Sequence, residues 1–357
     1  MSFLWRKDFG YMANVKSSIY FVPADRINSG IEKVLQLSGF LDALPYRHKL
    51  GVKVHFGEDG NNNYLSPKIV RTVIEVVSQR GVQPVLLETT TLYRGKRACA
   101  KSHVELALTH GFRLQEVLAP IEIIDGKIGE NYYTVPTNLP NVKNAKIGRG
   151  LRKIDLLLNL AHFKGHFVTG FGGAIKNIGM GLAAKAGKLD MHSVSKPYVN
   201  SEKCRSCGDC LSVCPVDAIS FVRYVAKIGP SCYGCASCIA VCPHGAIQVK
   251  WNEASAMTQF KIAEYAKAIL DKRKAFHFNF LINLTPNCDC YPHTEKPFLP
   301  DIGFLASYDP VAIDQAAYDK VKDHLKEIYS HINPEITLEH AEKIGLGSRS
   351  YQIIEVE

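Results

Sequence analysis

Eight cysteines crowded between Cys204 and Cys242 constrain this chain more than any other feature of its sequence. They form two runs, CRSCGDCLSVCP and CYGCASCIAVCP, and both runs have the spacing Cys-x2-Cys-x2-Cys-x3-Cys-Pro. Disulfide pairing is the alternative, but it is typical of small secreted domains and does not explain one short spacing used twice. The repeat therefore predicts thiolate ligands for metal.

This spacing is similar to that of bacterial-type ferredoxins, which carry two [4Fe–4S] clusters. The resemblance implies that three cysteines of each run hold one cluster and that the fourth reaches across to the other cluster. Zinc is the competing metal for a site of four thiolates, but this spacing favours iron–sulfur. The expected ligands are Cys204, Cys207, Cys210 and Cys242 for cluster I, and Cys232, Cys235, Cys238 and Cys214 for cluster II.

The sequence on both sides of these runs alternates between strand-like and helix-like segments. Near-continuous apolar strands of this kind are typical of a parallel sheet that is buried on both faces. We therefore expect an α/β, Rossmann-like fold with a mostly parallel sheet built from both ends of the chain, and a bacterial-type dicluster ferredoxin domain inserted into it. The expected domains are 1–196, 197–252 and 253–357; the expected strands are 50–56, 84–90, 154–160 and 276–284; and the expected helices are 66–81, 102–111 and 254–272.

Three longer strings carry a family resemblance: HFKGHFVTGFGGAIKNIGMG at 162–181, the Ser-Pro start of the helix at 66, and CDC followed by DIGFLASYDPVAID. Together they resemble ferredoxin-fused members of the family called domain of unknown function 362, over roughly residues 45–325. The frame also resembles the N-terminal domain of the nickel-pincer lactate racemases. In both cases the resemblance implies the fold, and only the racemase resemblance implies a reaction.

The racemase resemblance rests on a histidine that precedes a glycine-rich lysine motif by ten residues, here His166 and Lys176. It implies that His166 acts as an acid and base and that Lys176 holds a cofactor, with cofactor contacts at Gly172 and Gly173. The racemases have a second catalytic histidine, and His55 is its counterpart in this sequence. Lys164 and His162 follow the same apolar strand, and ligands of α/β sheets bind at the carboxyl ends of strands. We expect Lys164 to act at the site, and His162 to be a structural loop histidine.

The glycine-rich segment 170–181 is expected to open a helix whose backbone N–H groups could hold an anion. Gly165 favours a loop at 162–166. Asp309 is expected to cap the helix that begins at Pro310, which outweighs a catalytic role. The polar loop 57–63 either lines the pocket or forms only a turn.

Cys288 and Cys290 form a further Cys-x-Cys pair, with His293 nearby. Thiolates and imidazole are ligands of soft metals, so the two cysteines could bind a metal or act in redox chemistry. The alternative is a pair of structural or reactive thiols. We therefore allow an additional metal or organic cofactor in the α/β domain.

The leading functional hypothesis is an iron–sulfur oxidoreductase, or a subunit of one, that passes electrons through two [4Fe–4S] clusters to a site near His166 and Lys176. The alternatives are a pure electron carrier whose α/β domain docks a partner, and a non-redox isomerase-like enzyme with structural clusters. The net charge of +9 favours an acidic redox partner such as a ferredoxin or flavodoxin. We expect an unidentified small-molecule substrate, no nucleic acid, no membrane span and a cytoplasmic location, because no leader-like apolar segment opens the sequence.

Overall fold

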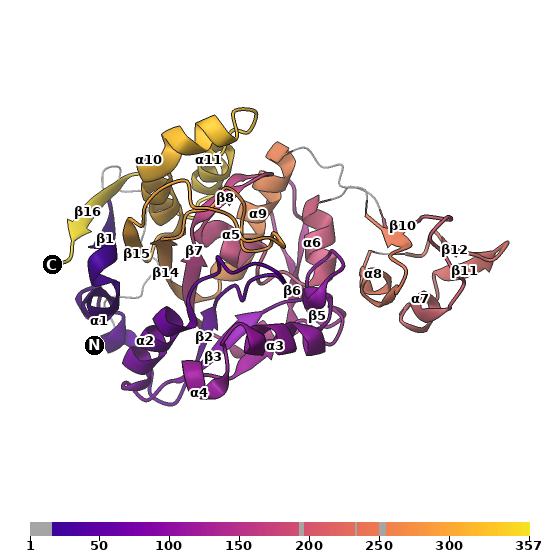
Figure 1. Cartoon of the computed structure of the whole chain (residues 1–357), viewed down its shortest axis with the longest axis horizontal. Coiled ribbons are helices and arrows are strands. Elements are labelled where there is room, and N and C mark those ends of the chain that lie inside the picture. Colours follow the sequence, from indigo (N-terminus) through magenta and orange to yellow (C-terminus); the bar gives the residue numbers. More distant parts are fainter. Residues whose placement is uncertain (1–15, 193–195, 233, 250–254) are drawn as a thin grey trace.

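The computed structural model describes residues 16–192, 196–232, 234–249 and 255–357 (Figure 1). Three sequence-based expectations concern residues outside these ranges. They are the domain boundary expected between 252 and 253, the start of a helix at Ala254, and the opening segment 1–15 on which the expected location depends.

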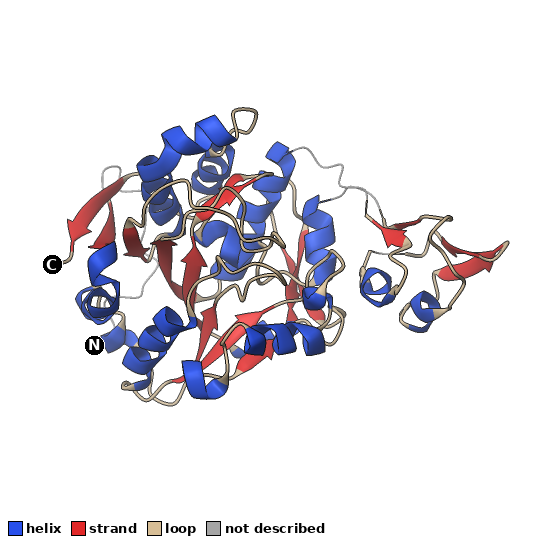
Figure 2. Cartoon of the chain, in the orientation of Figure 1, coloured by secondary structure: helices blue, strands red, loops and turns tan. Residues whose placement is uncertain are grey.

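One large sheet of eight strands forms the centre of the α/β part, in the order β16-β1-β15-β14-β7-β2-β3-β4 (Figure 2). Strands from before and after the cysteine-rich region are neighbours in it, since β7 pairs in parallel with both β2 and β14. The strands are β1 (Ser17–Pro23), β2 (Lys49–Lys53), β3 (Gln83–Glu88), β4 (Ile121–Ile123), β7 (Leu156–His162), β14 (Lys274–Leu281), β15 (Gly303–Ser307) and β16 (Tyr351–Glu355).

Seven of these eight strands run in one direction. The chain reverses only at β15, which is antiparallel to both β1 and β14. The mixed α/β class and the mostly parallel sheet expected from the sequence are thus confirmed. Because the strands on either side of β7 are parallel to it, the carboxyl ends of β2, β3, β7 and β14 meet at one edge of the sheet.

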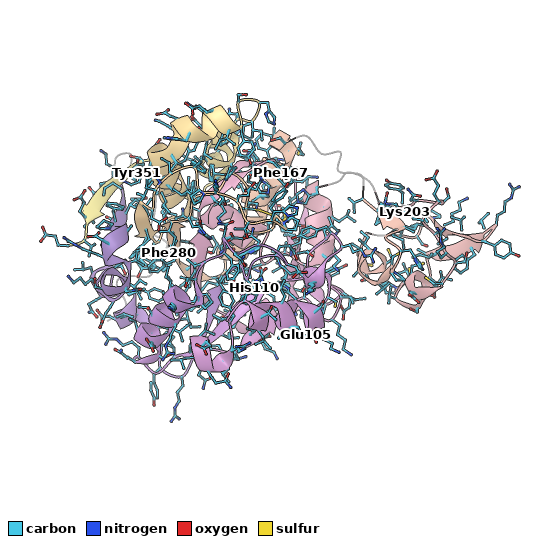
Figure 3. The ribbon with its side chains drawn as sticks, viewed as in Figure 1. Glu105, His110, Phe167, Lys203, Phe280 and Tyr351 are labelled. Atoms are coloured by element: carbon cyan, nitrogen blue, oxygen red, sulfur yellow. A yellow bond between two sulfur atoms is a disulfide. The ribbon has the colours of Figure 1, made fainter. Side chains whose placement is uncertain are left out.

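Helices cover both faces of the sheet, and each face has its own apolar core. One core joins Leu157 and Leu305 of the sheet to α5, α9 and α10, and the other joins Val52 and Phe278 to α1 and α2. Figure 3 shows Phe280 inside this layered part, and its side chain is fully buried. The helices are α1 (Ile27–Leu37), α2 (Pro67–Ser78), α3 (Ala100–Thr109), α4 (Leu114–Val117), α5 (Ala174–Gly179), α6 (Lys185–His192), α9 (Ser255–Leu270), α10 (Pro310–Ile328) and α11 (Glu335–Lys343).

Two helices begin where the sequence predicts, for the predicted reason. The Ser66 hydroxyl accepts a hydrogen bond from the Lys68 N–H at the start of α2. At α10, Asp309 Oδ1 accepts from the Val311 and Ala312 N–H groups at 2.8 and 3.0 Å. Both helices also have proline at their first position, where no intrahelical N–H donor is needed. The capping role expected for Asp309 is confirmed.

The cysteine-rich region forms a separate small unit beside the frame, on the right of Figure 1. Its strands pair only among themselves, and its apolar side chains form a small cluster to which the frame adds Leu92 and Leu189. Figure 3 shows Lys203 on this unit. Its elements are β10 (Tyr198–Val199), α7 (Asp209–Ser212), β11 (Ile219–Val222), β12 (Val225–Ile228), α8 (Ser237–Val241) and β13 (Ile247–Gln248).

Two small hairpins complete the frame: β5 (Tyr132–Pro136) with β6 (Asn144–Gly148), and β8 (Lys164–His166) with β9 (Gly170–Gly172). The loop expected at 162–166 is wrong, because His162 is the last residue of β7 and Lys164–His166 form β8, where His166 pairs with Gly170 of β9. Gly165 is needed for another reason: a Cβ there would lie 2.1 Å from the Pro286 carbonyl oxygen. None of the helices in the described residues has the length and apolar character that a bilayer span requires.

Candidate functional site

A cavity of about 140 Å³ opens at the edge where the carboxyl ends of the parallel strands meet. The segments that follow these strands each contribute a wall residue: His55 after β2, Arg97 after β3, His166 after β7 and Cys288 after β14. Lys176 of α5 lies in the same wall. Of the side chains predicted to act at this edge of the sheet, those of His55, His166 and Lys176 therefore line one pocket, together with Cys288 and Cys290.

Cys288 and Cys290 border the pocket, and their sulfur atoms are joined as a disulfide. The Asp289 side chain between them is buried. Its Oδ1 accepts from Lys164 Nζ at 2.5 Å and its Oδ2 contacts His162 Nδ1 at 3.1 Å. Burial alone would raise the pKa of Asp289, but these two partners lower it to about 2. The carboxylate is thus held ionised, and it fixes the cysteine loop against the frame.

The loop 57–63 supports the same segment from the other side. The Glu58 N–H donates to the Asp289 carbonyl oxygen at 2.9 Å, and Asn61 Nδ2 donates to the Tyr291 carbonyl oxygen at 2.8 Å. Lys164 Nζ also donates to the Asn63 carbonyl oxygen at 3.0 Å. This polar loop therefore packs behind the cysteine loop, and it adds none of these three side chains to the pocket wall.

His166 presents one nitrogen to the backbone and lies close to the disulfide. The N–H groups of Val168 and Thr169 both point at its Nδ1, at 3.2 and 3.1 Å. Because backbone N–H groups can only donate, Nδ1 is an acceptor and the proton of the neutral ring sits on Nε2. Burial lowers the pKa of His166 well below its ordinary value. A ring nitrogen of His166 and the sulfurs of Cys288 and Cys290 lie within 4.8 Å of one another.

Lys176 and Lys188 give the pocket a surplus of positive charge. Burial lowers the pKa of Lys176 to about 8, and the pKa of Lys188 likewise to about 8. Lys188 Nζ donates to the Thr90 carbonyl oxygen at 2.7 Å and contacts the Thr89 hydroxyl. The acidic groups of the wall already have basic partners of their own, so these two lysines favour an anionic group in the cavity.

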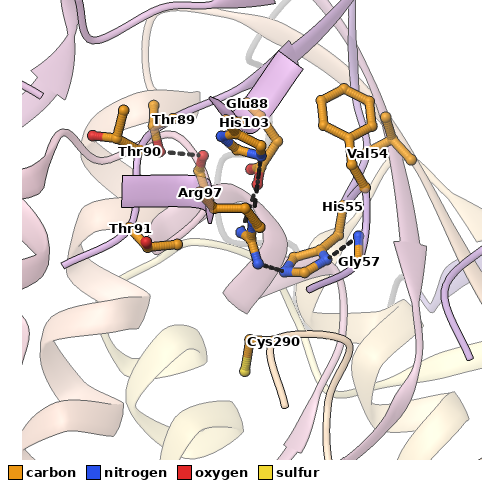
Figure 4. Close-up of polar contacts among 12 residues, drawn as sticks. Val54, His55, Gly57, Glu88, Thr89, Thr90, Thr91, Arg97, His103 and Cys290 are labelled. Carbon is orange, nitrogen blue, oxygen red and sulfur yellow. Dashed lines mark hydrogen bonds and ion pairs between the residues drawn. The ribbon is translucent and has the colours of Figure 1, made fainter. Parts of the chain in front are cut away.

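A buried ion-pair network forms the floor of the pocket (Figure 4). Glu88, the last residue of β3, pairs with Lys53 Nζ at 2.7 Å and with Arg97 Nη2 at 2.9 Å. Burial would raise the pKa of Glu88, but these cations lower it to about 2. Arg97 Nη1 also lies 2.8 Å from His55 Nε2, the contact drawn as a dashed line in Figure 4. The network holds His55 and Arg97 in place at the wall.

The anion cradle expected at the start of α5 is wrong. Asp314 of α10 occupies that position, since its carboxylate accepts from the Ala174 N–H at 2.6 Å and from the Ile175 N–H at 3.0 Å. Gly173 has no side chain because a Cβ there would lie 2.3 Å from Asp314 Oδ1. The amide groups at this helix terminus are therefore already satisfied, and the glycines allow a carboxylate to approach.

The remaining predicted site residues divide between the wall and its support. Gly172 and Gly173 line the pocket, as His55 does. Lys164 does not line it, because its ammonium is buried behind the cysteine loop in the pair with Asp289. His162 borders the cavity while both of its ring nitrogens face oxygen acceptors, Asp289 and the Ile282 carbonyl.

Sequence reasoning missed Glu88, Arg97, Lys188 and His192, all of which line the pocket. The sequence did contain a signal for Glu88. Glu88 follows the apolar run PVLL, and a charged side chain inside such a strand needs a buried partner. Lys53, in the strand GVKV, is the matching signal for that partner.

Two further cavities lie within the small unit, and each is lined by four cysteines. Three come from one run and the fourth comes from the other, which is the crossed grouping that the spacing predicts. One cavity is lined by Cys204, Cys207, Cys210 and Cys242, and the other by Cys214, Cys232, Cys235 and Cys238.

Backbone N–H groups donate hydrogen bonds to cysteine sulfurs in both of these cavities. The Ala218 N–H donates to Cys214 Sγ and the Ala246 N–H to Cys242 Sγ, each at 3.2 Å. Such hydrogen bonds stabilise a thiolate that carries negative charge. Four soft thiolates around each cavity, with amide donors to their sulfurs, suit an iron–sulfur cluster better than a hard cation. The cysteine-rich region can thus bind metal.

Leu92 connects the small unit to the pocket. It lines the cavity that contains Cys290, and it also packs in the apolar cluster that contains Cys238 and Cys242. Leu189 of α6 belongs to the same cluster. Burial lowers the pKa of Lys185, on the same helix, to about 8, and the nearby Cys238 thiol acts in the opposite direction. The small unit therefore contacts the frame next to the pocket.

Structural comparison returns a Thermotoga maritima protein solved by the Northeast Structural Genomics Consortium, with 13% identity, a TM-score of 0.44, and coverage of 85% of this chain and 59% of that chain. It also returns the lactate racemase apoprotein from Thermoanaerobacterium thermosaccharolyticum, with 14% identity, a TM-score of 0.38, and coverage of 75% and 51%. The chain thus spans less than two thirds of either protein. No curated protein sequence matches it. The family model described as domain of unknown function (DUF362) matches residues 50–319, and the chain belongs to that family.

Proposed function

We propose that this chain is an iron–sulfur electron-transfer protein or oxidoreductase that passes electrons through two [4Fe–4S] clusters to the pocket in its α/β domain. The observation that carries the proposal is the pair of cysteine-lined cavities, each formed by three cysteines of one run and the fourth of the other. This crossed arrangement is typical of dicluster ferredoxins. When bound, such clusters supply one-electron transfer at low potential.

The domain organisation belongs to the same proposal. Residues 197–252 would be a ferredoxin insertion between two parts of one α/β domain, 1–196 and 253–357. Support comes from the strand pairs that the small unit makes only within itself and from the strand order, in which β7 and β14 are neighbours although the unit lies between them in sequence. An insertion leaves such a sheet intact because the chain leaves and returns at one place.

The pocket supports an oxidoreductase over a pure electron carrier. A docking surface has no need for a cavity lined by His166, Lys176 and Arg97, because such polar and charged groups are costly to bury. Two-electron reduction of an organic molecule usually needs protons with the electrons, and imidazole and ammonium groups can supply them. Lys176 and Lys188 would hold the anionic part of a small substrate, and His166 would transfer a proton at its Nε2.

The redox partner would meet the small unit at its outer hairpin, β11–β12. Val222 is 49% exposed and Tyr224 is 86% exposed, with Arg223 between them. Phe221 of the same hairpin lines the cavity of Cys204 and its three partner cysteines. An apolar patch with basic neighbours suits an acidic partner such as a ferredoxin or flavodoxin, and the net charge of +9 agrees with this.

Iron and sulfide analysis of the anaerobically purified chain tests the proposal. We expect about eight irons and about eight acid-labile sulfides per chain, with electron paramagnetic resonance signals of [4Fe–4S]⁺ after reduction. The Cys99→Ser variant serves as the matched control, because Cys99 lines neither cysteine cavity. Mainly zinc, or an iron content near four, would rule out the two-cluster proposal.

A further inference from the structure

The pocket holds a feature that electron transfer through clusters does not by itself explain. Cys288 and Cys290 are joined, whereas Cys99 and the eight cysteines of the small unit are all free in the described part of the chain. The disulfide lies in the pocket wall next to His166, and Arg97 lines the same cavity.

A purely structural role does not fit this disulfide. It links residues only two positions apart, so it closes a very short loop and connects no two elements of the fold. The loop is already held by the Lys164–Asp289 ion pair and by the Glu58 N–H. Removing the bond would therefore leave the position of Asp289 unchanged, while the two sulfurs face a cavity.

The surroundings stabilise the reduced form. Arg97, Lys176 and Lys188 line the same cavity, and cationic neighbours favour a thiolate over a thiol. His166 has its Nδ1 saturated by backbone donors, so its Nε2–H is available as a donor within the pocket. A thiolate formed there gains hydrogen-bonding and electrostatic partners that a disulfide does not need.

We propose that Cys288 and Cys290 form a redox-active dithiol–disulfide couple that collects two electrons at the pocket. This inference rests on the proposed function, which supplies the electrons one at a time. Leu92, which touches both the pocket and the apolar cluster of Cys238 and Cys242, places the two redox sites next to each other.

The chemical step balances as follows. One S–S bond breaks, two electrons from a low-potential one-electron donor protein enter in succession, two protons are taken up, and two thiols form; two molecules of donor are oxidised. The reverse step delivers two electrons and two protons together to an organic two-electron acceptor. The couple thus converts one-electron transfer into the two-electron chemistry that a small anionic disulfide or similar acceptor requires.

The competing occupant of the reduced site is a soft metal ion held by the two sulfurs and His166. Coordination by Nε2 needs a lone pair on that atom. The backbone N–H groups of Val168 and Thr169 keep the lone pair of the neutral ring on Nδ1 instead. The hydrogen bonds therefore favour the dithiol over a metal centre.

Anaerobic reductive titration of the full-length chain tests the inference by counting electrons. The wild type is expected to take up about four electron equivalents, one for each cluster and two for the disulfide. The Cys288→Ser/Cys290→Ser double variant should take up about two and keep its iron. The Cys99→Ser control should still take up about four.

Differential alkylation with mass spectrometry gives a readout on the wild type alone. The peptide containing Cys288 and Cys290 should stay unlabelled before reduction and carry two labels afterwards. Uptake of about two equivalents by wild type with its full iron content, both thiols free in the isolated protein, or zinc bound at this pair after reduction would overturn the inference. Low iron content with a normal labelling pattern would defeat the proposed function and leave the couple supported.

Discussion

Replacing Asp289 by asparagine should destabilise the frame strongly, because it leaves the buried Lys164 ammonium without its counter-charge. The partners of Asp289 lower its pKa from the usual 3.8 to about 2, which corresponds to roughly 2–3 kcal/mol of stabilisation at neutral pH. Breaking a buried pair from one side costs roughly 3–5 kcal/mol. We therefore expect the free energy of unfolding to fall by roughly 2–5 kcal/mol.

Urea unfolding followed by far-ultraviolet circular dichroism measures this loss. The matched control is Asp289→Asn/Lys164→Met, which removes both charges and should recover most of the stability, since an apolar side chain of similar length replaces the ammonium. Lys164→Met alone should cost as much as Asp289→Asn. If Asp289→Asn lowered the stability by less than about 1 kcal/mol, the pair would resemble an exposed salt bridge and our account of how the cysteine loop is held would be wrong.

Four further predictions concern the pocket and the small unit. Glu88 should add about 3 kcal/mol to the free energy of unfolding above pH 4.5, and this contribution should be lost as the pH falls toward 2. The urea midpoint of Glu88→Gln should therefore fall less steeply than that of the wild type between these pH values. Acetic anhydride should label Lys176 before surface lysines, with a rate that rises through about pH 8, while the buried Lys164 stays unlabelled in peptide mass spectra. Cys242→Ser should abolish the resonance signal of the cluster held by the first cysteine run; loss of the other signal would contradict the crossed ligation. Deleting 197–252 and joining its ends with a short linker should leave a soluble, colourless protein, and an insoluble product would show that the unit is integral to the frame.

Local signals in the sequence predicted the elements of the frame well. Ser66 and Asp309 are capping residues followed directly by proline, so the start of each helix is determined within a few residues of chain. The apolar run before His162 predicted a strand buried on both faces, and β7 lies in the middle of the sheet. The position of His166 and Lys176 at one pocket followed from the rule that ligands bind where parallel strands end.

Contacts between distant parts of the chain were not predictable in this way. The reversal of β15 and the pairing of β1 with β16 join segments from opposite ends of the sequence, and neither segment carries a local mark of its neighbour. Lys164 looked like a site residue because it follows a strand end. Its partner Asp289 is 125 residues away, so only the folded loop shows that the ammonium supports the wall instead of lining it.

The small unit leaves the frame and returns to it close to the pocket. Helix α6 ends at His192, a pocket residue, only a few residues before the unit begins, and α9, which resumes the frame, contributes Ile262 to the same pocket. Near its start, the Ser255 hydroxyl donates to the Val168 carbonyl oxygen, two residues from His166. Both connections therefore leave from the rim of the cavity. An insertion at a loop on the opposite edge of the sheet would leave the unit distant from the strand ends, whereas here Leu92 both lines the pocket and packs in the apolar cluster of Cys238 and Cys242.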